Sequence, residues 1–412
     1  MGNVIKIGFI GIGQCGSNIA EIAELYGYRT AICNTSPEDL DSITLIKNKV
    51  LLGSNGGAGK DRRMAKQDAK ENYEKIVNLI KEKFNGINMI YFVFSAGGGT
   101  GSGMSPMMLD VVRRLVPEKN FGCVTVLPDK RESIVSQMNA LECLKEIIRL
   151  ELPCFIADNQ KLIDKTIRSR KDLFDKMNNY IIDCFNLIFN TNRKPSKYGN
   201  LDQQDIVRLL STPGATIITT TGIGKQEKTE KGFSFGKKLM KSWDNSYFAE
   251  IEYGKKLPTF GFIYELEEST TKLVEYSEIE KELGKSLETF EGYYEPNDGN
   301  ELITSILAGL SYPIERINEI SELIKNGRQE EKEEDYNDLF NVDTTWLNKN
   351  RDKSKFKTIQ DDEEEDDNED IEEFEEDEEE SKPIKKKKSS SNTPKKKKES
   401  SFNIEDIFAK YE

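Results

Sequence analysis

The chain has 412 residues, of which 36% are hydrophobic and 32% are charged, and its formal net charge is −14. Much of this charge lies in two adjacent blocks, because residues 361–380 hold 17 acidic residues and residues 382–398 hold nine lysines. Subtracting −17 and +9 from −14 leaves −6, so the overall acidity says nothing about the partners of the remainder. The sequence has no histidine, which excludes histidine-based triads and histidine zinc sites.

Apolar runs rich in β-branched and aromatic residues predict strands at residues 4–10, 29–35, 89–96, 121–128 and 153–158. Helical spacing of apolar residues predicts helices after the first of these strands, from about Arg63 to Phe84, after residue 103, and over residues 133–150. Strands that alternate with helices indicate an α/β fold with a doubly wound parallel sheet. Such sheets bind ligands at the carboxyl ends of their strands, where the glycine-rich loops of this sequence lie.

The loop GGGTGSG at residues 97–103 separates a predicted strand from a predicted helix. Glycine allows positive φ and lets backbone N–H groups approach a ligand without an intervening Cβ. At the start of a helix, these N–H groups and the positive end of the helix dipole form an anion site, most often for phosphate. A tight turn without a ligand is the alternative, but one or two glycines suffice for that.

Two other glycine-rich loops match known motifs only in part. Residues 11–16 fit G-x-G-x-x-G after a strand, but the second strand ends in Asn34 instead of the acidic residue that holds a dinucleotide ribose. The loop 53–63 contains a Gly-Lys pair, but Asp61 follows where a P-loop has Ser or Thr. These differences argue against a nicotinamide dehydrogenase and against a P-loop NTPase.

Four motifs together resemble those of the tubulin and FtsZ superfamily. They are GQCGSN at residues 13–18, GGAG at 56–59, GGGTGSG at 97–103 and NLDQQD at 200–205, and they occur in the family's order. The segment 302–331, with the charged tail behind it, resembles the TubZ branch, whose members are plasmid- and phage-encoded and move DNA. The resemblance implies a polymerising GTPase that hydrolyses GTP to GDP and phosphate.

The resemblance also implies which residues hold GTP. Around the phosphates it places Gly13, Gln14, Cys15, Gly16 and Asn18, and, from the third motif, Gly97, Gly98, Gly99, Thr100, Gly101, Ser102 and Gly103, with Thr100 and Ser102 adding hydroxyl donors. It places Ala58 and Gly59 at the γ-phosphate, and Asn34 and Glu132 near the ribose. FtsZ has an Arg four residues after this Glu, where the present chain has Ser136. Mg²⁺ is expected with the nucleotide and is not assigned to protein side chains.

Guanine recognition needs an acceptor that faces the N1–H and 2-amino donors. The resemblance assigns this role to Asp183 on the helix of residues 173–194, with Asn179 one turn earlier at the stacking position and Asn159 facing the nucleotide. A polar position on a surface face of the helix is the alternative for Asp183.

The segment NLDQQD implies the catalytic residues. Asp202 and Asp205 are three positions apart at the start of a predicted helix, so they share a face and could orient an attacking water, with Asn200 beside them. In the superfamily this loop inserts into the nucleotide site of the next subunit, so hydrolysis requires polymerisation. Capping of the helix by Asn and Asp is an alternative role that is compatible with the catalytic one.

We expect a GTP-binding domain at residues 1–172, a central helix at 173–194 and a smaller α/β activation domain at 195–312 that contains the catalytic loop. Residues 313–340 predict a long helix whose apolar stripe packs on the body, and residues 341–401 have a composition typical of a disordered charged linker. The lysine runs in this linker either contact DNA phosphates weakly or merely solubilise it.

Residues 402–412 predict a short amphipathic helix with Ile404, Ile407, Phe408 and Tyr411 on one face. We expect this peptide to dock into a partner, namely an adaptor protein that binds centromeric DNA, because the sequence names no place for it within the chain. Beyond self-assembly, the predicted role is segregation of plasmid or phage DNA. The alternatives are a phage spindle protein that positions replicating DNA, an FtsZ-like division-ring protein and a non-hydrolysing structural relative.

The six cysteines lie mostly in apolar runs without a C-x-x-C pair, and no apolar run reaches the roughly 18 residues of a membrane span. The chain begins directly with a strand pattern, so we expect no signal peptide. A reduced, bacterial cytoplasmic location is the resulting expectation.

Overall fold

The computed structural model describes residues 7–53, 56–163, 169–189, 194–229, 232–253, 256–333 and 404–411. Its elements, apart from the end of the last long helix, belong to one compact unit that spans Met1–Gln329 and Asn403–Glu412. The expected linker at residues 341–401, including its lysine runs, lies outside the described residues.

One ten-stranded sheet organises this unit, in the order β3-β2-β1-β4-β5-β6-β7-β10-β8-β9. The strands are β1 Ile7–Ile12, β2 Arg29–Asn34, β3 Lys49–Leu51, β4 Met89–Ser95, β5 Asn120–Leu127, β6 Pro153–Asp158, β7 Gly214–Ile223, β8 Thr259–Glu265, β9 Glu288–Tyr294 and β10 Glu301–Leu310. Strands β3 to β7 pair in parallel, whereas β10 is antiparallel to both of its neighbours. The predicted α/β fold with a doubly wound parallel sheet is confirmed.

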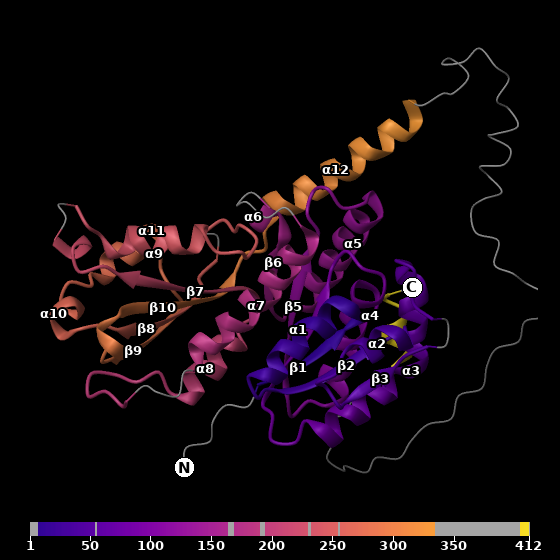
Figure 1. Ribbon diagram of the computed structural model, residues 1–412, viewed down its shortest axis with the longest axis horizontal. Helices are drawn as coiled ribbons and strands as arrows, with labels where there is room; N and C mark the ends of the chain where they lie inside the picture. The colour runs from indigo at the N-terminus through magenta and orange to yellow at the C-terminus, as the bar shows by residue number, and fades with distance from the viewer. Residues whose placement is uncertain are drawn as a thin grey trace, which may run out of the picture. The chain divides into compact units, whose positions relative to one another are not determined.

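The helices cover both faces of the sheet (Figure 1). They are α1 Gly13–Leu25, α2 Pro37–Ser42, α3 Arg62–Lys83, α4 Thr100–Leu115, α5 Ile134–Leu150, α6 Asn159–Ile163, α7 Arg170–Ile188, α8 Gln203–Leu210, α9 Phe235–Asp244, α10 Glu268–Thr271, α11 Tyr276–Leu283, α12 Ile314–Glu333 and α15 Glu405–Phe408. Alternation along β1 shows the two faces, because Phe9 packs with α1 and α7 while Ile10 packs with α3 and α4.

The first strand and its neighbours place the glycine-rich loops side by side. The chain leaves β1 for β2 on one side of the sheet and enters β4 on the other, so the strand order reverses between β1 and β4. The carboxyl ends of these two adjacent strands lead into the motif at residues 13–18, which begins α1, and into the motif at residues 97–103, which ends in the first turn of α4. Such a reversal opens a crevice at the edge of the sheet, and it is the usual ligand position in open α/β sheets.

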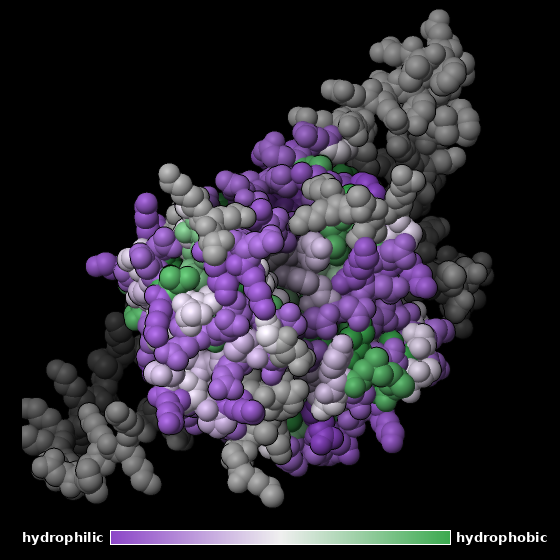
Figure 2. All heavy atoms as spheres, turned by 60° about the vertical axis from the view of Figure 1, so that its left-hand side comes forward, coloured by the Kyte–Doolittle hydropathy of each residue, from purple (hydrophilic) through white to green (hydrophobic). Residues whose placement is uncertain are grey.

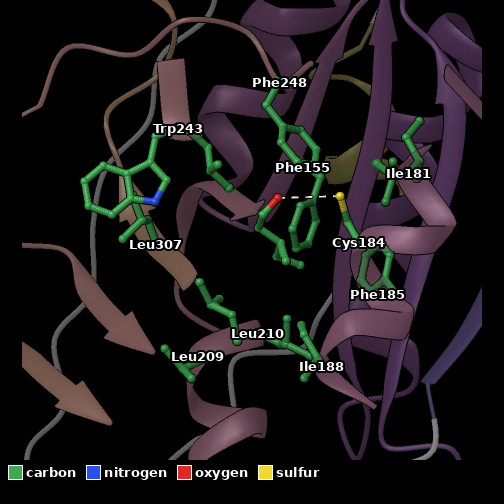
Figure 3. Packing of buried hydrophobic residues seen from close by; sticks show 14 of the residues in the cluster. Phe155, Ile181, Cys184, Phe185, Ile188, Leu209, Leu210, Trp243, Phe248 and Leu307 are labelled. Atoms are coloured by element: carbon green, nitrogen blue, oxygen red, sulfur yellow. Dashed lines mark hydrogen bonds between the residues drawn. The ribbon is translucent and has the colours of Figure 1, made fainter. Parts of the chain in front are cut away.

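Helix α7 joins the parallel part of the sheet to the second part of the chain. It presents Ile181, Cys184, Phe185 and Ile188 to a core that also contains Phe155, Leu209, Trp243 and Phe248 (Figure 3). The thiol of Cys184 lies 3.5 Å from the carbonyl oxygen of Ile218 on β7. Strand β6 pairs with β7 at Pro153 and Cys154 alone, so α7 and its core supply much of the connection. The separate domain boundaries expected at 172, 194 and 312 stay a prediction.

Helix α12 packs through most of its expected apolar stripe. Ile320 and Ile324 are buried and Ile317 is partly buried, but Ile314 at the start of the helix is exposed. Arg316 is also buried: its Nε donates to Asp158 Oδ2 over 2.9 Å, and Nη2 donates to the Pro128 carbonyl over 2.7 Å. This buried ion pair ties α12 to the ends of β5 and β6.

The C-terminal peptide corrects one expectation. Its apolar face does have a place within the chain, since Ile407, Phe408 and Tyr411 are buried in the same core cluster as residues of α3 and α4. Sequence reasoning missed this contact because it joins segments more than 300 residues apart.

On the face shown in Figure 2, hydrophobic residues form small groups among hydrophilic ones, an arrangement that by itself marks no partner.

Candidate functional site

A cavity of about 440 Å³ lies at the switch point of the sheet. Its walls combine the ends of β1, β4 and β5 with α7 and the loops between them, and its lining residues are Ile12, Gly13, Gln14, Cys15, Asn18, Asp39, Lys60, Ser95, Gly97, Gly98, Gly99, Thr100, Gly101, Val126, Glu132, Ser136, Asn159, Phe174 and Asn178. The volume lies in the range of small-molecule and cofactor sites.

The first loop forms one wall of this cavity. Helix α1 begins at Gly13, whose φ of +71° lies in the left-handed region that favours glycine. Gln14 donates through Nε2 to Asn18 Oδ1 over 3.1 Å, which orders the first turn. Gly16 does not line the cavity: a Cβ there would lie 1.9 Å from the Val93 carbonyl oxygen, so this glycine lets α1 pack against β4. Burial, with the nearby charge of Glu132, raises the pKa of the Cys15 thiol to about 12, so this thiol stays neutral.

The third motif supplies the opposite wall. An added Cβ at Gly98 would meet nothing within 4 Å, so the backbone here faces open space. The Thr100 hydroxyl lies 2.9 Å from the Thr35 hydroxyl at the end of β2. The Ser102 hydroxyl was expected to be a donor to the phosphates. Instead it is buried and donates to the Gly98 carbonyl, so it does not face the cavity. Gly103 is likewise outside the lining, where a Cβ would meet the Arg62 carbonyl oxygen at 2.7 Å.

Asn139 on α5 stabilises this loop, and sequence reasoning missed it. Its Nδ2 donates to the Gly98 carbonyl over 3.1 Å and to the Lys60 carbonyl over 3.0 Å. One amide therefore connects the third motif to the loop of the second motif. No local sequence pattern marks this residue, because its role depends on helix packing.

The second motif reaches the cavity through Lys60. Ala58 is buried and neither it nor Gly59 lines the cavity, whereas Lys60 does. The backbone of Lys60 has a φ of +65°, which is unusual for a residue with a side chain. Its Nζ donates to Ser136 Oγ over 2.8 Å and to Ser133 Oγ over 3.2 Å. The Lys60 ammonium thus lies beside Ser136, the position at which FtsZ has an arginine.

Glu132 lines the cavity as expected. Burial, and secondarily the charge of Asp129, raises its pKa above the ordinary value. Asn34 is buried behind the cavity lining. Its side chain accepts from the Thr35 N–H over 2.8 Å and donates to Asp39 Oδ2 over 3.1 Å. Asp39, not Asn34, faces the cavity, and it was not among the predicted residues.

On the α7 side of the cavity, only part of the lining agrees with the prediction. Asn159 lines it as expected, and within the described part of the chain its buried Oδ1 has no hydrogen-bond partner. From α7 the lining residues are Phe174 and Asn178. Asn179 is exposed and donates to the Asp175 carbonyl over 2.7 Å. Asp183 accepts from the Tyr26 hydroxyl over 3.3 Å and lines a separate cavity beside α9.

The helix geometry explains why Asn178 and Asp183 line different cavities. Asp183 lies five positions after Asn178, and at 3.6 residues per turn this spacing rotates a side chain by about 140° around α7. The four-residue spacing of Phe174 and Asn178 instead keeps an aromatic ring and an amide on one face. An unpaired buried amide oxygen, an adjacent amide and an aromatic ring suit a purine base with N–H donors.

The predicted catalytic residues lie outside the cavity lining. Asp202 caps α8: its Oδ1 accepts from the N–H groups of Gln204 and Asp205 over 2.7 Å and 3.0 Å, and Asp205 Oδ2 accepts from the Asp202 N–H over 3.0 Å. Asn200 holds the preceding loop through Ser196. Burial, together with the charge of Asp202, raises the pKa of Asp205. Helix capping is therefore present, and the catalytic role stays a prediction.

Glycine-rich loops at the switch point of a parallel sheet, an open backbone at Gly98 and a base end on α7 define a nucleotide-binding α/β protein. The model of the Tubulin/FtsZ family GTPase domain matches residues 6–166. The tubulin-like protein TubZ of Clostridium botulinum C phage is 31% identical over 295 residues, covering 70% of this chain and 75% of that protein. The chain therefore belongs to the tubulin/FtsZ family of GTPases.

Other comparisons agree with this assignment. The tubulin-like protein CetZ of Pyrococcus horikoshii is 25% identical over 316 residues, covering 73% of this chain and 84% of that protein. The structure of the tail-truncated TubZ of Clostridium botulinum phage c-st superposes with a TM-score of 0.64 at 26% identity, over 80% of this chain and 100% of that one. The GTPγS-form protofilament of Bacillus thuringiensis serovar israelensis TubZ gives a TM-score of 0.67 at 17% identity, over 80% and 93%, which shows the shared fold. None of the described helices is long and apolar enough to cross a membrane.

Proposed function

We propose that this protein assembles with GTP into filaments and hydrolyses GTP in a site shared between two subunits. The observation that carries this proposal is the separation of binding and catalytic residues. The cavity holds the phosphate loops, but Asp202 and Asp205 lie elsewhere, at the exposed start of α8. A second copy that brings its α8 to this cavity would complete the site. The protofilament form of the Bacillus thuringiensis TubZ, a protein of the same fold, supports such an arrangement.

Within this proposal, the cavity residues divide by chemistry. The N–H groups of residues 13–15 and 97–101 bind the phosphates, and the Lys60 ammonium adds a positive charge beside them. Asn178 and Asn159 accept from the N–H groups of guanine, and Phe174 stacks on it. The Asp202 and Asp205 carboxylates of the neighbouring subunit orient the attacking water.

Mg²⁺ fits the same site as an ion carried by the nucleotide. Among the described residues, no cluster of three potential metal ligands occurs, but the Asp39 carboxylate lines the cavity. Mg²⁺ usually keeps several waters and binds through one or two carboxylates plus substrate phosphates. Asp39 is therefore the proposed protein contact of the ion, and when bound the ion neutralises charge on the phosphates.

A mixing experiment tests the shared site. Gly98→Asp should abolish nucleotide binding, because the new carboxylate enters the open space beside Gly98 and repels phosphate. Asp205→Asn keeps the cavity but removes the catalytic carboxylate. Each variant alone should be inactive, whereas a mixture should recover part of the GTPase activity through interfaces that pair an intact cavity with an intact α8.

Lys81→Asp is the matched control, since it adds a carboxylate at an exposed position of α3 outside the cavity lining and should leave activity near that of the wild type. If the mixture stayed as inactive as its components while both variants joined wild-type filaments, the shared site would be wrong.

For the cellular role, we propose segregation of plasmid or phage DNA through an adaptor that binds the C-terminal peptide. The similarity to a phage protein and the amphipathic peptide support this role. A replicon that encodes Asp205→Asn should be lost from dividing cells faster than one that encodes the wild type. Equal inheritance of the two replicons would contradict the proposal.

A further inference from the structure

The C-terminal peptide occupies a specific place on the GTPase part of its own chain. Ile407, Phe408 and Tyr411 are 1%, 3% and 9% exposed and Ile404 is partly buried, so most of the apolar face of the C-terminal peptide is covered. The covering surface consists of α3 and α4, the two helices that follow the loops of the second and third motifs. Figure 1 shows the C-terminus beside these helices. A peptide this short is unstable as an isolated helix, so the contact itself supplies its stability.

The contacts are directional as well as apolar. The Phe408 ring packs edge-on against Tyr73 with a centroid distance of 5.6 Å, and Lys70 Nζ lies 5.6 Å from the Phe408 ring centre. Lys66 Nζ donates to the Tyr411 carbonyl over 2.7 Å. The Tyr411 hydroxyl donates to the Pro106 carbonyl on α4 over 3.3 Å. Hydrogen bonds at one end and an aromatic anchor in the middle fix the register of the peptide.

Charge complements this fit. The peptide carries Glu405 and Asp406, and Lys70 of α3 lies 3.9 Å from Glu405. Lys66 contributes a second cation beside the Tyr411 ring, at 5.8 Å from its centre. On the other edge, Lys410 approaches Asp110 of α4 at 3.9 Å. The surface is therefore suited to an acidic amphipathic helix with an aromatic residue at its centre.

The same surface is linked to the phosphate loop. Glu146 of α5 accepts from both Lys66 and Arg62, and Arg62 also donates to the Ser102 carbonyl over 3.0 Å. Ser102 needs this external donor because Pro106, four residues later in α4, has no N–H to give. One ion-pair cluster thus joins the docked peptide to the helix that begins at the third motif.

We propose that the α3–α4 surface is a binding site for an acidic amphipathic peptide and that its resident ligand is the C-terminal peptide of the same chain. The peptide that captures an adaptor is then withheld while it is docked, since the adaptor and the α3–α4 surface need the same apolar face. The withholding of the peptide from an adaptor rests on the proposed function, whereas the binding site itself does not. An adaptor that releases the peptide must offer an apolar groove flanked by cations.

A competition experiment with a fluorescent synthetic peptide of residues 402–412 tests the site in the absence of nucleotide. The hosts are the full-length wild type and full-length Phe408→Ala, in which the resident peptide has lost its anchor. A tethered peptide competes at an effective concentration of the order of mM. The added peptide should therefore bind Phe408→Ala on the order of tenfold more tightly than it binds the wild type.

Charge reversal on α3 provides the matched pair of groove and control variants. Combined with Phe408→Ala, Lys70→Glu should weaken binding of the added peptide severalfold. Lys81→Glu, an exposed position on the same helix outside the contact, should not change it. Circular dichroism of both variants confirms that α3 is intact.

Equal affinity of the wild type and Phe408→Ala would overturn the proposal, as would absence of binding to Phe408→Ala. Masking in the wild type that disappears on dilution of the host would mean that a second copy donates the peptide, which also contradicts the resident assignment. Failure of the mixing experiment on GTPase activity would refute the shared catalytic site and leave this outcome unaffected.

Discussion

The ammonium nitrogen of Lys60 lies 2.8 Å from the hydroxyl oxygen of Ser136, so two residues 76 positions apart meet at the nucleotide cavity. Neither the left-handed backbone of Lys60 nor a cation at the N-terminus of α5 is favourable for stability alone. Both features are understandable if the ammonium group serves to bind an anion. This relationship leads to a prediction that separates binding from folding.

Lys60→Gly should weaken GTP binding about tenfold or more, because a charge-assisted hydrogen bond contributes about 1.5–3 kcal/mol. The same change should leave the free energy of unfolding unchanged or slightly higher, since glycine adopts the φ of +65° without strain. Isothermal titration and urea unfolding measure the two quantities. Lys60→Arg, which keeps a cation, is the control. A loss of stability without a loss of affinity would mean that Lys60 is only structural.

Guanine selectivity should depend on Asn178 and not on Asp183. Asn178→Ala removes an acceptor inside the cavity and should reduce the preference for GTP over ATP by about 10-fold to 100-fold, the cost of an unpaired buried donor being about 1–3 kcal/mol. Asp183→Ala should preserve the preference, because that carboxylate lies beside a different cavity. Competition of GTP and ATP for each variant measures this. The reverse result would return the base contact to Asp183.

Acidification should slow hydrolysis through Asp205. Its pKa is raised above the ordinary 3.8 by burial and by the charge of Asp202, so the ionised form is lost at a higher pH than for a free aspartate. The rate per polymerised subunit, followed from neutral pH down to the lowest pH at which the filaments persist, should fall on the acid side. Asp202→Asn should keep an acid limb, because asparagine still caps α8, but the limb should move to lower pH because the Asp202 charge that raises the pKa of Asp205 is gone. A rate that is independent of pH over this range would argue against Asp205 as the base.

The raised pKa of Asp205 affects the free energy of unfolding in the opposite direction from hydrolysis, because a lower pH favours the folded state. A folded-state pKa above the unfolded one means that the folded state holds the proton more tightly. Asp205 therefore stabilises the fold below its unfolded pKa and loses this contribution as the pH rises through its folded pKa. At neutral pH, Asp205→Asn should accordingly be no less stable than the wild type in urea unfolding.

The buried pair of Arg316 and Asp158 should be essential for stability. Arg316→Leu leaves Asp158 buried without its partner and should lower the free energy of unfolding by about 3–5 kcal/mol. The deficit should shrink as the pH falls, because burial raises the pKa of Asp158 and protonation removes the uncompensated charge. Glu319→Gln, which removes the exposed ion pairs of Glu319 with Arg316 and Lys130, should change stability by less than about 1 kcal/mol. A similar loss in both variants would contradict a special role for the buried pair.

The sequence by itself determined the parts of this protein that depend on neighbouring residues. Apolar runs marked most of the parallel strands, and glycines marked the loops behind β1 and β4, because a buried strand and a phosphate loop each impose their pattern locally. It did not mark β10, and it did not mark β9, whose residues are mostly only partly buried and form no continuous apolar run. The order and spacing of the four motifs were enough to identify the family.

Tertiary structure decided which side chains meet. The phase of α7 selects Phe174 and Asn178 over Asn179 and Asp183, because each position turns the side chain by about 100° and only packing sets the phase. The contact of Lys60 with Ser136 and that of the C-terminal peptide with α3 and α4 join distant segments. The energy of such contacts comes from shape, burial and charge across the fold, and no local pattern encodes it.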